Sequence, residues 1–292
     1  MKIAIDVTWL KPGKSGGVES MFRNLLEGLV NNKDENIYYL LLAQDNYHTF
    51  LEYEKNQKVK LIKCNTKAEN VKAHILWQNL FQYRVLKKYN LKNCFFPVYE
   101  RPIFKNKKIK TITTICDILA FHYPNYFSKL ENMWFKLGWK AAIKQSDKVI
   151  AITNFTKRDL EKNFNAKNVQ RIYVPVDIKK EEFIDFKKLE KKYGIEQNNY
   201  YYAICSTYPH KNLMTLLKMM EEINKYKNIP QKLIVSGVKG YQQDTLMQEL
   251  KEKKLNKKVI FTGFVSNEER NTLLKNANIY LLNTRCVFNS RA

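Results

Sequence analysis

The hydrophobic pattern is most regular between residues 200 and 220, where an apolar run is followed by a helical stripe. Residues 200–205 form a β-prone run without helical spacing, which predicts a buried strand. Pro209 ends this run, and beyond it apolar residues recur at i, i+3, i+4 and i+7, which predicts one face of an amphipathic helix. They are Leu213, Leu216, Leu217 and Met220. The turn between the two elements is therefore expected at the carboxyl end of a strand, where α/β sheets place their ligands.

The same alternation of strand and helix continues along the chain. Short β-prone runs predict strands at 2–7, 38–43, 59–64, 94–96, 111–115, 148–152 and 171–174, and again at 200–205, 232–236, 259–261 and 279–282. The segment 178–194 is dense in Lys and Glu and ends at Gly194, which is typical of a connection with a short solvated helix. The pattern predicts the α/β class, with two Rossmann-like doubly wound domains at residues 1–180 and 181–292.

Two predicted helices of the first domain have mixed surfaces. Ser128 and Glu131 form a capping box that opens one of them. The apolar residues on one side of this helix are Leu130, Met133, Trp134, Leu137, Ala141 and Ala142. The other helix, roughly 69–88, has Leu76, Leu80 and Tyr83 on one face, and the opposite face has Trp77, Phe81, Arg84, Lys87 and Lys88. Aromatic and cationic side chains on one face suit either a lipid headgroup surface or the solvent side of a core helix.

The composition adds a strong positive charge. The 292 residues include 51 Lys and Arg against 28 Asp and Glu, which gives a formal net charge of +23. Such a charge favours polyanionic partners, namely nucleic acid, an anionic membrane surface or a phosphorylated substrate. Abundant Lys, Asn, Ile and Tyr are equally typical of an A/T-biased genome, so both interpretations stay open. Because no recognition module or stacked aromatic–basic pattern accompanies the charge, nucleic acid is not expected as a partner.

The cysteines and the apolar runs indicate the compartment. The five cysteines are odd in number and show no metal or disulfide spacing, so a reducing compartment fits best. Asp6 lies where a signal peptide needs its apolar region, and no apolar run approaches the ~20 residues of a membrane span. We expect a cytoplasmic protein, with any membrane contact peripheral and on the inner face of the cell membrane.

Lys211 is the first candidate for chemistry, because it lies in the turn that precedes the helix at 213. The first backbone N–H groups of a helix are unpaired and partly positive, so they suit an anion. A mobile ammonium beside them is expected of a phosphate site. The alternative is that Lys211 is a solvated surface lysine, one of 51 basic residues.

Other candidates also follow predicted strands. Gly16 and Gly17 precede a helix, where they permit either close backbone approach to a ligand or only a flexible turn. Asp117 and His122 follow the strand at 111–115, and His122 is either a contact to a sugar hydroxyl, a general acid or base, or a packed structural residue. The glycines that directly follow strands of the second domain are Gly237 and Gly263.

Several motifs occur in one order along residues 1–282. They are GGVE at 16–19, Asp117 with His122 and Pro124, VIAIT with FTK at 149–157, YPHKNL at 208–213, IVSG at 234–237 and FTGFVS at 261–266. In this order they resemble the retaining glycosyltransferases of the GT-B fold, specifically glycosyltransferase family 4, and the Pro-His-Lys-Asn sequence is similar to mannosyltransferase-type members. The resemblance implies two domains that face each other across a cleft. The first would bind a lipid-linked or oligosaccharide acceptor and the second a nucleotide-sugar donor.

The resemblance also implies roles for individual residues. Lys211 would neutralise the departing diphosphate of the donor, which is the main electrostatic task of the reaction. His122 would contact the transferred sugar, and Asp117 is the further catalytic candidate. The donor-binding residues would be Gly16, Gly17, Thr207, His210, Lys211, Gly237, Gly263, Phe264 and Val265. The acceptor side would include Glu19, Thr153 and Lys157. No metal is implied, and no cofactor other than the nucleotide-sugar as co-substrate.

Three features depart from the family pattern. Ser206 and Thr207 stand where a glycine is common, and no arginine accompanies Lys211, so a protonated His210 is expected as a partial substitute. Residues 174–177 read VPVD in place of Asn-Gly-Val-Asp. No pair of glutamates seven residues apart follows the strand at 279–282, so the second domain is expected to be truncated and incomplete. The implied function is hexosyl transfer to a glycolipid or cell-surface polysaccharide precursor. The alternative is a catalytically inactive remnant that only binds an acceptor or a membrane.

Overall fold

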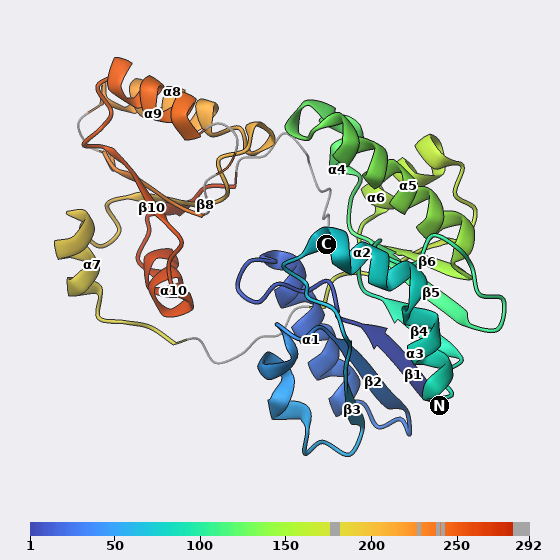
Figure 1. Ribbon diagram of the computed structural model, residues 1–292. Coiled ribbons are helices and arrows are strands. Elements are labelled where there is room, and N and C mark those ends of the chain that lie inside the picture. The colour runs from blue at the N-terminus through green and yellow to red at the C-terminus, as the bar shows by residue number, and fades with distance from the viewer. Residues whose placement is uncertain (176–181, 227–228, 238–239, 241–242, 283–292) are drawn as a thin grey trace. The chain divides into compact units, whose positions relative to one another are not determined.

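The computed structural model describes residues 1–175, 182–226, 229–237, 240 and 243–282. The chain divides into two compact units, Met1–Asp177 and a second that begins at Ile178. Each unit is a parallel sheet with helices on both of its faces (Figure 1). The predicted α/β class, with two Rossmann-like doubly wound domains, is confirmed.

The first unit is built on a seven-stranded sheet in the order β3-β2-β1-β4-β5-β6-β7, and its pairs are all parallel. The strands are β1 (Lys2–Asp6), β2 (Ile37–Leu42), β3 (Val59–Lys63), β4 (Asn93–Phe96), β5 (Lys110–Ile115), β6 (Lys148–Ala151) and β7 (Val169–Arg171). The strand order reverses between β1 and β4. In doubly wound sheets, ligands bind at the carboxyl ends of the strands beside such a reversal.

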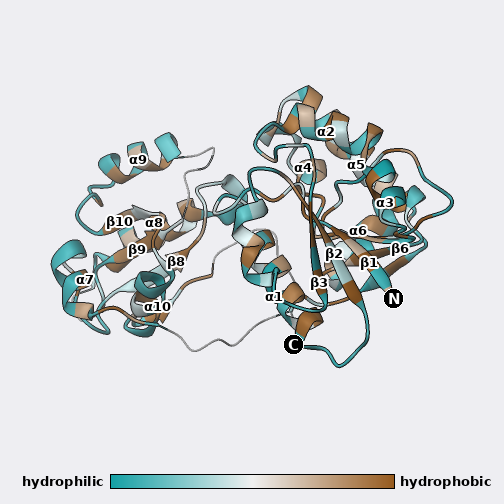
Figure 2. Cartoon of the chain, turned by 60° about the horizontal axis from the view of Figure 1, so that its bottom comes forward, coloured by the Kyte–Doolittle hydropathy of each residue, from teal (hydrophilic) through white to brown (hydrophobic). Residues whose placement is uncertain are grey.

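Helices cover both faces of this sheet because successive strand residues point to opposite sides. On one face, α1 (Gly17–Asn31) buries Phe22 and Leu26 against Ile5. On the other face lie α2 (Val71–Leu80), α3 (Gln82–Lys88), α5 (Lys129–Gln145) and α6 (Asn154–Phe164). In Figure 2 the strands carry long hydrophobic stretches, whereas the helices alternate hydrophobic and hydrophilic bands. The first unit therefore has its own core on each side of the sheet.

The second unit has a four-stranded parallel sheet in the order β10-β9-β8-β11. Its strands are β8 (Tyr201–Ile204), β9 (Leu233–Ser236), β10 (Val259–Gly263) and β11 (Ile279–Tyr280). The helices α8 (Leu213–Ile223) and α9 (Gln243–Glu252) cover one face, and α7 (Phe186–Tyr193) and α10 (Asn267–Lys275) cover the other. The predicted stripe Leu213, Leu216, Leu217 and Met220 is buried in α8 and is confirmed. The strand order reverses beside β8, whose following loop contains Lys211.

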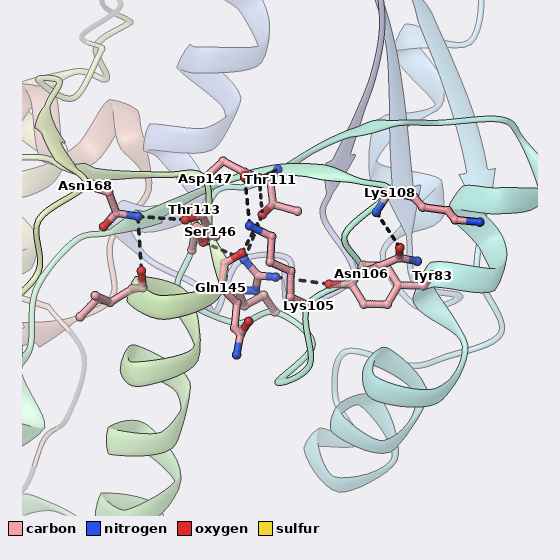
Figure 3. A network of polar contacts seen from close by, with 12 residues as sticks. Tyr83, Lys105, Asn106, Lys108, Thr111, Thr113, Gln145, Ser146, Asp147 and Asn168 are labelled. Atoms are coloured by element: carbon pink, nitrogen blue, oxygen red, sulfur yellow. Dashed lines mark hydrogen bonds and ion pairs between the residues drawn. The ribbon is translucent and has the colours of Figure 1, made fainter.

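Polar contacts join β5 and β6 at their amino ends (Figure 3). The Asp147 carboxylate accepts a hydrogen bond of 2.8 Å from the Thr111 backbone N–H. The hydroxyls of Thr113 and Ser146 lie 2.7 Å apart, and the Asn168 amide donates to the Ser146 carbonyl over 2.9 Å. Ligands bind at the carboxyl edge in this architecture, so these contacts stabilise the sheet and are not part of a site.

Two helices differ from the predictions. The capping box of Ser128 and Glu131 is confirmed at the start of α5. However, Leu130, Met133 and Leu137 are exposed, because α5 packs on the sheet through Trp139, Ala142 and Ile143.

The helix predicted at 69–88 is divided at Phe81 into α2 and α3, and the buried side of α2 differs from the prediction. Leu76 and Leu80 are exposed, whereas Trp77 is buried. The reason is that α2 buries His74 and Gln78, whose polar partners lie at the end of β1. Trp77 is thus part of the core, whereas Phe81, Arg84, Lys87 and Lys88 of the same predicted face are exposed, so a membrane contact of these four residues stays a prediction.

Candidate functional site

Lys211 lies at the start of α8, in the loop that follows β8. A single 3₁₀ turn, Pro209–Lys211, ends at Asn212, whose φ of 55° turns the chain into α8 without a side-chain cap. The Lys211 side chain is half-buried, and no carboxylate of the described residues pairs with it. An ammonium without a counter-charge beside a helix start is a suitable site for a phosphate group.

His210 adds no positive charge to this loop. Burial first, and then the charge of Lys211, lower the pKa of His210 to about 4. The imidazole is therefore neutral near pH 7, and the expectation that a protonated His210 replaces the missing arginine is wrong. The His210 ring lies against Tyr208 with their centroids 5.9 Å apart, which gives it a packing role.

Gly237 follows β9 and lies beside the loop of Lys211. Its φ is +149°, and a Cβ added there would lie 2.1 Å from the Cys205 carbonyl oxygen. Its N–H donates to the Gly263 carbonyl over 2.9 Å, which joins the ends of β9 and β10. The close approach of the chain to itself is enough to require glycine here, so a donor contact at Gly237 stays a prediction.

The remaining residues of the second unit that were predicted to bind the donor lie in the same set of loops. The Thr207 hydroxyl is buried and accepts a 2.6 Å hydrogen bond from the Gly240 N–H, so it stabilises the loop. Gly263 has a φ of +73° with open space where a Cβ would point. Phe264 beside it is 78% exposed and Val265 is partly buried, which leaves an aromatic surface free to stack on a base.

In the first unit, Gly16 and Gly17 open α1 after β1. Gly16 has a φ of 57°, no side chain caps the helix, and open space surrounds both glycines. The backbone at this helix start is therefore accessible to an anion. Glu19 has local partners, since one carboxylate oxygen accepts from the Gly13 N–H at 2.9 Å and the other pairs with Arg23 at 3.0 Å. Its acceptor role stays a prediction.

Asp117 and His122 follow β5 as predicted, and each has its own partner. The Asp117 carboxylate accepts from the Leu119 N–H over 2.9 Å, at the entry to the short helix α4 (Leu119–His122). His122 Nε2 lies 2.6 Å from the Asp159 carboxylate of α6, whose other oxygen accepts from Asn163 at 2.6 Å. Asp159 thus fixes the orientation of a half-exposed imidazole. The sequence pattern did not indicate Asp159.

Thr153 and Lys157 of the predicted acceptor side lie on α6. Thr153 is the N-cap of this helix, and its hydroxyl accepts from the Thr156 N–H at 3.0 Å. Lys157 lies on the surface, 3.8 Å from Glu161. Neither residue is brought to the ends of β1 and β4 by an observed contact, so their acceptor roles stay predictions.

A buried polar chain that the sequence analysis missed lies beside the strand reversal of the first unit. Asp6 ends β1 and accepts from the Thr8 hydroxyl at 2.6 Å. The Thr8 oxygen lies 2.9 Å from His74 Nε2, and Gln78 donates to the other Asp6 oxygen at 3.1 Å. His74 Nδ1 lies 3.9 Å from the carboxylate of Glu100, in the loop after β4. Only the position of Asp6 at a strand end was a signal in the sequence.

The described residues hold no group of three or more His, Cys, Asp and Glu side chains that could bind a metal ion. In the part of the chain that the structure describes, helices are too short or too polar to cross a membrane. What the loops do offer is an unneutralised ammonium, open helix starts, an exposed aromatic ring and a histidine oriented by a carboxylate.

Two Rossmann-like units in one chain, each with its polar loops beside a strand reversal, define the GT-B class of fold. Residues 15–180 match the family model described as Glycosyltransferase Family 4, and residues 185–285 match the one described as Glycosyl transferases group 1. The chain belongs to glycosyltransferase family 4.

The chain is also similar to individual proteins, in sequence to one relative and in fold to several solved structures. The O-antigen chain mannosyltransferase RfbU of Salmonella typhimurium is 27% identical over 176 residues, which are 60% of this chain and 45% of RfbU. The match thus spans less than half of that relative's length. Among solved structures, Anabaena Alr3699/HepE in complex with UDP and glucose aligns with a TM-score of 0.61 at 18% identity, over 91% of this chain and 70% of HepE. WaaG, a glycosyltransferase involved in lipopolysaccharide biosynthesis, aligns with a TM-score of 0.63 at 11% identity, over 97% of this chain and 75% of WaaG.

Proposed function

We propose that this chain transfers a hexose from a nucleotide-sugar donor to a glycolipid or cell-surface polysaccharide precursor, with retention of configuration and without a metal ion. Family membership and the mannosyltransferase relative support this proposal. The observation that carries it is the Lys211 ammonium, which has no described carboxylate partner and lies at the start of α8. As the glycosidic bond breaks, the nucleoside diphosphate gains negative charge, which a cation and helix amides stabilise.

The other loops suit the remaining parts of the substrates. Phe264 would stack on the base, and the open backbone at Gly16 and Gly17 would approach the sugar-phosphate. His122, held by Asp159, would contact the transferred sugar. The first unit would hold the acceptor.

Nucleotide binding tests the proposal directly. Wild-type chain is expected to bind UDP or GDP in isothermal titration, and Lys211→Ala is expected to weaken that binding about 10-fold to 100-fold, because a hydrogen bond to a charged group is lost. Lys218→Ala is the matched control, since Lys218 is an exposed lysine within α8, the helix that Lys211 precedes. Equal affinity of wild type and Lys211→Ala for both nucleotides would contradict the donor site.

The finer parts of the proposal have separate tests. Transfer or donor hydrolysis that persists in EDTA supports metal independence, and an NMR measurement of the product anomer tests retention. A chain that binds nucleotide but neither transfers nor hydrolyses the sugar would favour the alternative, a remnant without catalysis.

We also propose that the first unit contacts an anionic membrane surface through α5, in keeping with a cytoplasmic, peripheral location. Leu130, Met133 and Leu137 follow one another at i, i+3 and i+7 and are all exposed. Exposed lysines of the same helix accompany them, namely Lys129, Lys136, Lys140 and Lys144. Apolar side chains beside lysines are the composition that binds the interface of an anionic bilayer.

Vesicle flotation tests this second proposal. Wild-type chain is expected to float with vesicles that contain phosphatidylglycerol and to float less with pure phosphatidylcholine, because each basic residue near an anionic surface contributes about 1 kcal/mol. The triple variant Leu130→Ser, Met133→Ser, Leu137→Ser is expected to lose most of the binding. Met247→Ser, at an exposed methionine of α9, serves as control. Unchanged flotation of the triple variant would rule out α5 as the contact.

A further inference from the structure

The buried chain of Asp6, Thr8 and His74 ends in an unused hydrogen-bond acceptor. The Thr8 hydroxyl is 2.6 Å from an Asp6 carboxylate oxygen, to which it donates its only proton. Its oxygen must then accept at 2.9 Å from His74 Nε2, which fixes the proton of the imidazole on Nε2. Burial lowers the pKa of His74 and keeps the ring neutral. Nδ1 is therefore an acceptor with a free lone pair.

A second acceptor faces this lone pair across a gap. The Glu100 carboxylate lies 3.9 Å from Nδ1, which is too far for a hydrogen bond. No described donor lies against Nδ1 or against the Glu100 carboxylate, although the His74 side chain is only 3% exposed. The Glu100 side chain is 38% exposed, so a ligand can reach it from solvent. Ordinary hydrogen bonds are about 2.8 Å long, so a single hydroxyl oxygen can contact both atoms.

We propose that His74 Nδ1 and the Glu100 carboxyl bind a hydroxyl group of a carbohydrate acceptor, and that Asp6 and Thr8 are positioning residues for His74. The place supports this assignment, because Asp6 ends β1, Thr8 follows it and Glu100 follows β4, and the strand order reverses between β1 and β4. The inference rests on the proposed function, since it names the acceptor contact of that transferase.

The protonation of Glu100 completes the arrangement. Partial desolvation of the carboxyl first, and then the negative charge of Asp6, raise the pKa of Glu100 to about 7, while Lys11 acts in the opposite direction. Asp45 and Lys11 are the other charged groups that act on His74. A protonated Glu100 donates to the ligand hydroxyl, and that hydroxyl donates to Nδ1, so every partner is satisfied. An ionised Glu100 would accept the hydrogen bond of the ligand hydroxyl itself, which would leave Nδ1 without a donor.

The test is glycoside binding without any nucleotide. Methyl glycosides of mannose, galactose and glucose are titrated into the full chain while the His74 imidazole ¹⁵N resonances are followed by NMR. We expect Nε2 to carry the proton, and the Nδ1 resonance to shift with at least one glycoside. Glu100→Ala should weaken that glycoside about 10-fold to 100-fold, as is usual for a lost hydrogen bond in a desolvated site. Glu52→Ala, at an exposed glutamate of the same unit, should bind like the wild type.

Glu100→Gln distinguishes a ligand contact from a structural role. Its amide imitates the protonated carboxyl, so we expect wild-type affinity at about pH 6 and no change up to about pH 8. The wild type should lose about tenfold over the same range, because the pKa of Glu100 near 7 is crossed. An Nδ1–H tautomer, no glycoside binding, or unchanged binding by Glu100→Ala would each overturn the proposal. Nucleotide binding at Lys211 is measured separately, so failure of either site is recognised independently of the other.

Discussion

Replacing Gly237 by alanine is expected to cost the second unit about 3–5 kcal/mol in free energy of unfolding, through backbone strain and overpacking together. The new Cβ would lie 2.1 Å from the Cys205 oxygen and 2.6 Å from its carbonyl carbon, both backbone atoms that cannot rotate away. The φ of +149° adds strain for any side chain. To relieve the contact, the ends of β8 and β9 must separate, which also displaces the loop of Lys211.

The tryptophans allow the unfolding of the first unit to be followed separately from that of the second. All four of them, Trp9, Trp77, Trp134 and Trp139, lie in the first unit. Urea unfolding of Gly237→Ala should therefore show an unchanged tryptophan fluorescence transition and an early loss of far-UV circular dichroism. Nucleotide affinity should fall with it.

Gly28→Ala is the matched control for this substitution. Gly28 lies within α1 with open space where the Cβ would point, so alanine there is expected to stabilise the helix by about 0.5–1 kcal/mol. If Gly237→Ala unfolded at the wild-type urea concentration by both probes, the close approach would not be a constraint in solution.

The elements that sequence reasoning predicted correctly are those whose patterns are local. The run at 200–205 became β8, and the α8 stripe is buried because one face of that helix is apolar and the other is not. The capping box at Ser128 involves a partner three residues away, within reach of a spacing argument.

The predictions failed where a helix has apolar residues on both faces. In α2, the buried side includes His74 and Gln78, which a hydrophobicity pattern places in solvent. Their burial is stabilised by Asp6, 72 residues before Gln78 in the chain. A periodicity shows that a stripe exists, but only the long-range partners decide which stripe faces the sheet.

The candidate site shows the same division. Lys211, the glycines and His122 were predicted as site residues because each follows a strand, and strand ends are readable in the sequence. Asp159, 37 residues from His122, and Glu100, 26 residues from His74, were not found, since only the fold brings them together. The predicted positive charge of His210 was wrong for a related reason, because burial by neighbouring residues lowers its pKa.

Arg101 provides the second large effect. Its guanidinium is buried in the first unit and donates to the hydroxyls of Ser146 at 2.7 Å, Thr111 at 3.2 Å and Tyr83 at 3.3 Å. It also lies over the Phe96 ring, 5.2 Å from the centroid. One planar fork thus joins the start of α3 to the amino ends of β5 and β6, a task that needs its several fixed donors.

Arg101→Ala should therefore lower the free energy of unfolding of the first unit by about 3 kcal/mol, because it leaves buried hydroxyls without a donor and opens a cavity. Arg101→Lys should lose about half as much, since an ammonium keeps the charge but cannot reach three oxygens at once. Tryptophan fluorescence during urea unfolding reports this unit.

Lys105→Ala is the control for Arg101, because it removes a neighbouring cation whose pair with Asp147 at 3.0 Å is partly exposed. That loss should be at most about 1 kcal/mol. The comparison distinguishes the loss of the Arg101 hydrogen bonds from the loss of a positive charge. Should Arg101→Ala cost no more than Lys105→Ala, the buried guanidinium would be only a space-filling group, and the amino edge of the sheet would be held by Asp147 and its backbone contacts instead.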